Sequence, residues 1–235
     1  MKIFTNKENI KDKEAFIEGD DVKHIREVMR LKVGDEIVIC DGDKNDYLCK
    51  IESLTKNKAR FQVLNRSGNE AEPSVNITLY QALPKAGKLE EIITKATELG
   101  IKRIVPIETA FSVVKAKDVN ARKYERYEKV AKAAAQQCRR GIIPKIEEAL
   151  HFNDISPEGD VFLAYEKEKS KLREVSTIKD DVSIIVGAEG GFSEFEIALA
   201  KEKGFYIVGL GSRILRLETA SVVLATLILN LKGDL

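Results

Sequence analysis

The sequence predicts an α/β protein built from two parts, a small antiparallel β barrel followed by a larger domain with a mostly parallel sheet. In the first part, short β-prone runs are separated by strongly turn-forming residues, as in a barrel or meander. In the second part, short apolar strands alternate with helices, which is typical of a parallel sheet covered on both faces. The length of 235 residues is enough for both parts to bury a core.

The first part contains three predicted strands, at residues 35–40, 47–54 and 58–64, with a turn at 41–46. Residues 65–74 are polar, contain Gly and Pro, and fit a linker. We therefore expect domains at residues 1–68 and 69–235. Before the strands, the segment KHIREVMRLK places Lys23, Arg26 and Arg30 at helical spacing, so they would share one helical face. That face is either solvated or binds a polyanion.

The second part alternates regularly between strands and helices. Strands are predicted at residues 75–83, 101–107, 161–165, 182–187 and 205–211. Helices are predicted at 88–100 with Gly100 as the stop, from about 118 to 141, from the Ser193/Glu196 capping box onward, and at 220–231.

Composition excludes several classes of function. A net charge of +1 does not by itself indicate a nucleic-acid binder, and there is no apolar run long enough for a transmembrane helix. The charged amino terminus lacks the apolar core of a signal peptide, so we expect a cytoplasmic protein. Cys40, Cys49 and Cys138 show no C-x-x-C spacing, and the two histidines have no partner at ligand spacing. We therefore expect no metal.

A glycine loop, VGAEGGFSEFE, follows the strand at 182–187 and leads into a helix. Its G-x-x-G-G spacing matches neither the dinucleotide nor the phosphate-loop pattern, and Glu189 would repel phosphates. A second loop, GLGSRILRLETA, also follows a strand and carries Arg213, Arg216 and Glu218 in an apolar passage. The loops are either tight turns with a structural Arg–Glu pair, or two walls of a cleft at the carboxyl ends of neighbouring strands.

These two loops together resemble the signature motifs of the RsmE-type ribosomal RNA uridine-N3 methyltransferases of the SPOUT superfamily. The segments VMRLKVGDEIVICDG, LPKAGKLEEIITKATELGIKRIVPI, AAAQQCRRGIIP and FLAYE are similar to further motifs of that family, in the same order. The resemblance covers nearly the whole chain.

The resemblance implies a fold and an activity. The fold would be a SPOUT-type α/β domain with a carboxy-terminal trefoil knot, preceded by a PUA-like β-barrel domain that contacts RNA. The activity would be methylation of N3 of a uridine in 16S ribosomal RNA by a homodimer that uses S-adenosylmethionine. Within the superfamily, a ribose 2′-O-methyltransferase is the alternative, and a non-enzymatic RNA-binding protein that dimerises through the knot is another.

The resemblance also implies roles for individual residues. Either a base removes the N3 proton, for which Glu218 is the candidate, or positive groups stabilise the uracil anion, for which Arg216 or Arg213 is the candidate. The cofactor-binding residues would be Leu163, Tyr165, Glu166, Val186, Gly187, Glu189, Gly190, Gly191, Leu210, Gly211, Ser212, Ile214, Leu215, Arg216, Thr219 and Ala220. The RNA-binding residues would be Arg26, Arg30, Lys85, Lys88, Gln137, Arg139 and Arg140.

Three positions depart from the family's usual residues. Ala188 stands in place of proline, Leu217 in place of threonine, and Phe111 in place of a frequent arginine, which puts one RNA contact in doubt. None of the three changes Glu218, Thr219, Arg216 or the loop glycines.

Overall fold

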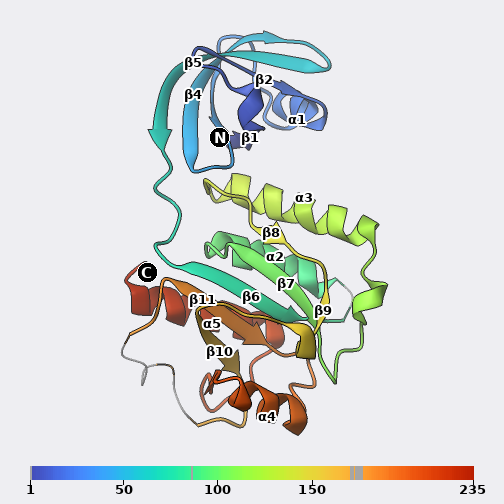
Figure 1. Ribbon diagram of the computed structural model, residues 1–235. Helices are drawn as coiled ribbons and strands as arrows, with labels where there is room; N and C mark the ends of the chain where they lie inside the picture. Colours follow the sequence, from blue (N-terminus) through green and yellow to red (C-terminus); the bar gives the residue numbers. More distant parts are fainter. Residues whose placement is uncertain (1, 86, 170–171, 173–176) are drawn as a thin grey trace. The chain divides into compact units, whose positions relative to one another are not determined.

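The structure, a computed structural model, describes residues 2–85, 87–169, 172 and 177–235. Contacts within the chain divide it into two compact units (Figure 1). Unit 1 contains Met1–Glu72 and Ala135–Ile143, and unit 2 contains Pro73–Ala134 and Pro144–Leu235. Unit 1 is therefore built from two stretches of chain that lie far apart in the sequence.

Unit 1 is a five-stranded sheet in the order β1-β3-β4-β5-β2. β1 pairs with β3 in parallel, and the other pairs are antiparallel. The bounds are β1 Lys2–Phe4, β2 Glu14–Glu18, β3 Glu36–Cys40, β4 Asn45–Leu54 and β5 Lys58–Gly68, with the short α1 Asp20–Lys23 and η2 His24–Val28 between β2 and β3. Register shifts in the long β4–β5 pair mark bulges, which increase local twist and bending.

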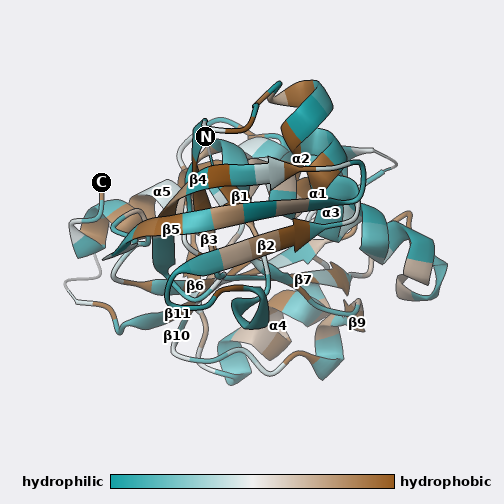
Figure 2. Ribbon diagram, turned by 90° about the horizontal axis from the view of Figure 1, so that it is seen from above, coloured by the Kyte–Doolittle hydropathy of each residue, from teal (hydrophilic) through white to brown (hydrophobic). Residues whose placement is uncertain are grey.

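The core of unit 1 lies on one face of this sheet. Buried and exposed residues alternate along β4, and hydrophobic and hydrophilic positions alternate along the strands in Figure 2. The buried positions, together with helical Val22 and Ile25, form a single apolar cluster around Ile39, Ile51 and Phe61.

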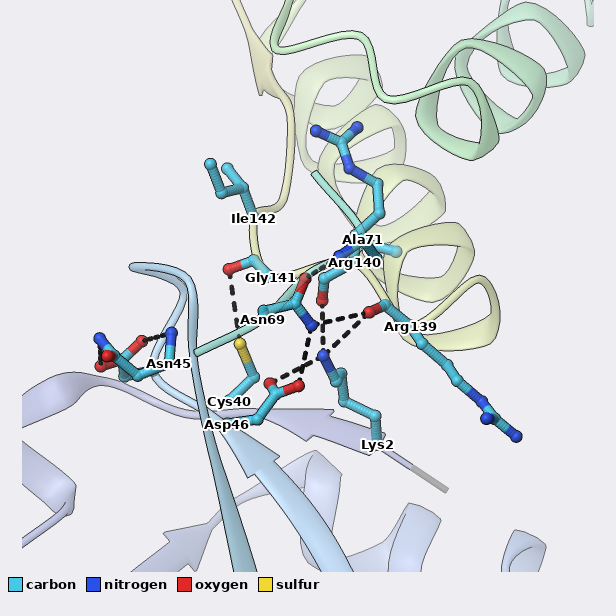
Figure 3. A network of polar contacts seen from close by, with 12 residues as sticks. Lys2, Cys40, Asn45, Asp46, Asn69, Ala71, Arg139, Arg140, Gly141 and Ile142 are labelled. Atoms are coloured by element: carbon cyan, nitrogen blue, oxygen red, sulfur yellow. Dashed lines mark hydrogen bonds and ion pairs between the residues drawn. The ribbon is translucent and has the colours of Figure 1, made fainter. Parts of the chain in front are cut away.

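Polar contacts attach Ala135–Ile143 to the rest of unit 1 (Figure 3). The Lys2 ammonium donates to the backbone carbonyls of Arg139 (2.9 Å) and Arg140 (3.0 Å) and pairs with Asp46 at 2.7 Å. Asn69 donates to Asp46 (2.8 Å) and to the Arg139 carbonyl (3.1 Å). The buried Lys2 side chain therefore joins β1, β4 and the returning segment.

Unit 2 is a parallel sheet in the order β12-β10-β11-β6-β7-β8, with the short β9 also paired to β7. Its strands are β6 Asn76–Ala82, β7 Arg103–Glu108, β8 Lys145–Ile146, β9 Leu150–His151, β10 Asp160–Ala164, β11 Asp181–Val186 and β12 Tyr206–Val208. Its helices are α2 Lys88–Glu98, α3 Ala121–Gln137 (whose last turn belongs to unit 1), α4 Glu194–Glu202 and α5 Leu217–Lys232. The parallel sheet expected from the alternating pattern is confirmed.

Helices cover both faces of this sheet, with α2 and α4 on opposite sides in Figure 1. The face toward α4 buries Tyr80, Val105, Leu163 and Ile185 in a cluster with Ile197 of that helix. On the other face α2 and α5 pack together, and Ser221 of α5 hydrogen-bonds to buried Gln81 of β6. No helix in the described part of the chain is long and apolar enough to cross a membrane.

Several expected boundaries are corrected. β5 continues to Gly68, and Asn69 and Glu72 are anchored by hydrogen bonds, so residues 65–74 are not a free linker. The long helix starts at Ala121 and ends at Gln137, and the last helix begins at Leu217, three residues before its expected start. Lys23, Arg26 and Arg30 do not share a helical face, because the π-helical turn η2 changes the spacing and Arg30 lies beyond it at φ 55°.

Candidate cofactor and nucleic-acid site

Three loops meet at one edge of the unit 2 sheet. They follow β11, β10 and β12, and the carboxyl ends of parallel strands lie at the same edge. Together the loops line a cavity of about 460 Å³. The prediction that the two glycine loops follow neighbouring strands is wrong, since β10 lies between β11 and β12 and adds a third wall.

The loop after β11 is a tight turn closed by a hydrogen bond from the Gly191 amide to the Ala188 carbonyl (2.9 Å). Gly191 has φ 69°, which a residue with a side chain rarely adopts. A Cβ on Gly187 would lie 3.0 Å from the Phe192 ring, so backbone and ring approach each other closely. The turn then enters α4 through the predicted capping box, in which Ser193 Oγ accepts from the Glu196 amide and Glu196 Oε2 accepts from the Ser193 amide.

The loops after β10 and β12 form the other walls. Tyr165 donates its amide to the Val208 carbonyl at 2.9 Å, which ties the two loops together. The Glu166 carboxylate lies 3.3 Å from where a Gly191 Cβ would be, so it faces the glycine turn. Ile214 lines the cavity with 86% of its surface exposed, so this wall is open to solvent.

Lys88, at the start of α2, lies between two carboxylates, Glu189, which lines the cavity, and Glu218, the predicted base, which is not among the lining residues. Its ammonium is 3.5 Å from Glu189 Oε1 and 3.7 Å from Glu218 Oε2. Glu218 is buried in the first turn of α5, where the helix N-terminus favours a negative charge. Its Oε2 receives no hydrogen bond from any described residue, which is costly for a buried carboxylate.

Most predicted cofactor residues line the cavity. They are Tyr165, Glu166, Val186, Gly187, Glu189, Gly190, Gly191, Leu210, Gly211, Ile214, Leu215, Arg216 and Ala220, and the predicted catalytic Arg213 joins them. Leu163, Ser212 and Thr219 are not among the lining residues; Leu163 lies in the core under α4. Sequence reasoning did not assign Ala164, Ala188, Phe192 and Leu217 to the cavity, although each is next to an assigned residue, and it gave Lys88 to RNA alone.

One predicted RNA contact is wrong. Arg140 is only 2% exposed, and its guanidinium is paired with the buried Glu72 carboxylate, so it is not available to a phosphate. Its neighbour Arg139 is exposed, has φ 63°, and extends its side chain away from the network in Figure 3. Arg30, Lys85 and Gln137 are also exposed, and Arg26 is half-buried and paired with Glu27.

A metal site is not found among the described residues, in which no three His, Cys, Asp or Glu side chains are grouped as ligands. The cavity is instead lined by glycine backbone, apolar side chains and both signs of charge. Such an arrangement suits an organic ligand with both apolar and charged groups.

Family models define the class of protein. Residues 71–229 match the RNA methyltransferase domain, and residues 17–64 match the RNA methyltransferase PUA domain. The class is therefore an RNA methyltransferase with a PUA domain in front. The expected PUA-like front domain, the α/β methyltransferase domain and the activity class are confirmed.

Relatives give the particular family. Ribosomal RNA small subunit methyltransferase E of Bacillus subtilis is 37% identical over 229 residues, which cover 91% of this chain and 89% of the relative. The enzyme of the same name from Aquifex aeolicus is 31% identical over 98% of this chain and all of its own length. The chain belongs to the family of ribosomal RNA small subunit methyltransferase E.

Solved structures agree in fold. Ribosomal RNA small subunit methyltransferase E from Neisseria gonorrhoeae, bound to S-adenosyl methionine, superposes with a TM-score of 0.90 at 24% identity, covering 98% of this chain and 97% of that one. A Legionella pneumophila protein in complex with the bound cofactor SAM gives 0.87 at 26% identity, covering 97% and 96%.

Proposed function

We propose that the protein transfers a methyl group from S-adenosylmethionine to N3 of a uridine in 16S ribosomal RNA. The observation that carries the proposal is the cavity between the loops after β10, β11 and β12, in a chain of this family. The chain's similarity to enzymes acting on small-subunit ribosomal RNA supplies the substrate class.

The lining residues fit S-adenosylmethionine. A volume of about 460 Å³ lies in the usual range for a ligand of this size. Gly187, Gly190 and Gly191 let backbone amides and carbonyls approach an adenine, while Val186, Leu210 and Leu215 provide apolar walls. Glu166 and Glu189 suit the positive sulfonium of the cofactor.

The cofactor supplies an electrophilic methyl group on a sulfonium. Uridine N3 carries a proton at neutral pH, which must leave as the new N–C bond forms. Glu218 would accept this proton. Two observations support the assignment: its buried Oε2 has no hydrogen bond from the described residues, and its neighbour Leu217 lines the cavity, although Glu218 itself does not. Arg213 and Arg216 line the same cavity and would stabilise negative charge on the uracil oxygens.

Residues 1–68 would be the PUA-like RNA-binding domain, and residues 69–235 the methyltransferase domain with a trefoil knot. RNA would be held by the exposed Arg30, Lys85, Gln137 and Arg139 and by the half-buried Arg26, with Lys88 at the cavity. The enzyme would act in the cytoplasm as a homodimer.

Methyl transfer from labelled S-adenosylmethionine tests the proposal. Small-subunit particles from cells lacking the gene are incubated with protein and cofactor, and the RNA is digested to nucleosides. We expect label in 3-methyluridine. Label in a 2′-O-methylated nucleoside would instead make the protein a ribose methyltransferase. No cofactor binding at millimolar concentration would make it a non-enzymatic RNA-binding protein.

The role of Glu218 has its own test. Glu218→Gln keeps the shape of the side chain but removes the base. Single-turnover methylation at saturating RNA should fall by about 10²–10⁴-fold, while calorimetric affinity for S-adenosylhomocysteine stays close to wild type. A full single-turnover rate in this variant would remove the base role.

A further inference from the structure

Phe111 is an exposed aromatic residue beside the cofactor cavity. It lies in the loop after β7, and 51% of its surface is accessible. The β7 loop leaves the sheet at the same edge as the cavity loops, because β7 is parallel to β6 and β6 to β11. Phe111 is not part of the apolar core cluster of unit 2.

The Cβ and Cγ atoms of Phe111 contact the glycine turn of the cavity. A Cβ on Gly190 would lie 2.7 Å from Phe111 Cβ and 3.3 Å from its Cγ, so the two residues are in direct contact. Gly190 lines the cavity, whereas Phe111 is outside the set of lining residues. The ring is therefore on the rim, next to the cavity and outside its lining.

The loop that carries Phe111 is held in place on both sides of the residue. The Ala110 amide donates to Glu196 Oε1 at 2.8 Å. The other oxygen of this carboxylate accepts the Ser193 amide in the capping box of α4. Two hydrogen bonds of 3.0 Å join Thr109 and Ser112: the Thr109 amide donates to Ser112 Oγ, and the Ser112 amide donates to the Thr109 carbonyl. The ring is thus presented from a fixed base, and little ordering is left to be done when a partner binds.

We propose that Phe111 is a stacking platform for an unpaired base of the RNA next to the uridine that receives the methyl group. The inference rests on the proposed function, because it takes small-subunit RNA as the partner. Recognition of unpaired RNA relies on bases stacked on aromatic side chains, and an enzyme acting on a base edge needs that base out of its stack. A flat ring on the rim holds the neighbouring base while the acceptor uridine enters the cavity.

Stacking differs from a phosphate contact in its response to salt. Phe111→Ala should weaken binding of a 16S RNA transcript about five- to a hundredfold. The slope of log K against log salt should not change, since no phosphate contact is lost. Phe111→Tyr should stay within about twofold of wild type, and Phe111→Leu should behave like Phe111→Ala. Val113→Ala is the matched control, because Val113 is 65% exposed on the same loop.

The proposal would be overturned by wild-type affinity for the RNA transcript in Phe111→Ala or Phe111→Leu, or by a loss of RNA affinity in Val113→Ala as large as that in Phe111→Ala. It would also be overturned if Phe111→Ala lost as much affinity for S-adenosylhomocysteine as for RNA, or changed its oligomeric state in sedimentation. The last two results would assign the ring to the cofactor loop or to a subunit contact. Failure of the proposed function is separate from these, since it would appear as wild-type protein that does not methylate small-subunit RNA.

Discussion

The Arg140 guanidinium and the Glu72 carboxylate form a two-point ion pair inside unit 1. Arg140 Nε donates to Glu72 Oε1 at 3.1 Å and Nη2 to Oε2 at 2.7 Å, with side chains 2% and 6% exposed. The same Oε1 accepts the amides of Gly141 (2.9 Å) and Ile142 (3.1 Å). One carboxylate thus satisfies a buried cation and two backbone donors, and it attaches Ala135–Ile143 to the end of the first stretch of unit 1.

Truncating one partner of this pair should strongly destabilise the protein. Arg140→Ala leaves the Glu72 charge buried without its cation, and breaking such a pair costs about 3–5 kcal/mol. The free energy of unfolding in urea measures the loss. Arg139→Ala, next in the chain but exposed, should stay within about 0.5 kcal/mol of wild type. Equal stabilities for the two variants would show that the pair is not structural.

Cys40 and Cys49 should be chemically inert in the folded protein. Both are buried, and burial raises the pKa of each thiol to about 12. At pH 8 the reactive thiolate is then about 2,000-fold scarcer than in a free cysteine of pKa about 8.5. Alkylation with iodoacetamide followed by peptide mass spectrometry should modify half-buried Cys138 first, and the other two only in urea. Rapid labelling of Cys40 would contradict this.

Glu108 should make stability depend on acid pH. Burial alone would raise the pKa of its carboxyl. The Ala116 amide at 2.8 Å, the Lys115 ammonium at 3.2 Å and nearby His151 outweigh burial, so the pKa is lowered. A lowered pKa contributes stability that is present above the unfolded value of about 4.3 and is lost as pH falls through the folded pKa. Wild type should therefore exceed Glu108→Gln in stability at pH 7, and the difference should shrink toward pH 3. A difference that is constant with pH would remove Glu108 as its source.

The elements that follow from local chemistry could be predicted from the sequence. The α4 cap depends on Ser193 and Glu196, three residues apart, and the Gly100 stop depends on a positive φ of 84°. Both were confirmed because the physical cause lies within a few neighbouring residues.

Relationships across long stretches of sequence could not be predicted. Arg140 is part of a basic run and was expected to contact RNA, but its partner Glu72 lies 68 residues away. In the same way, the position of β10 between β11 and β12 depends on pairing across the whole sheet. The third wall of the cavity was therefore expected only from the family resemblance, which assigned Tyr165 and Glu166 to the cofactor. Arg30 was misplaced because a π-helical turn cannot be distinguished from an α-helix by spacing.

Gly190→Ala should destabilise unit 2 through Phe111 alone. Gly190 does not need a positive φ, so alanine suits its backbone, but the new Cβ would lie 2.7 Å from Phe111 Cβ. Because that loop is held by Glu196, relief requires a shift of packed backbone, and we expect a loss of about 1–3 kcal/mol in the free energy of unfolding. Gly68→Ala is the matched control, since nothing lies within 4 Å of its Cβ position. In a double-mutant cycle, Phe111→Ala should recover only part of the loss, because alanine keeps the Cβ that the new methyl group meets, whereas Phe111→Gly should recover most of it. Additive effects of Gly190→Ala and Phe111→Gly would mean that the two residues do not touch.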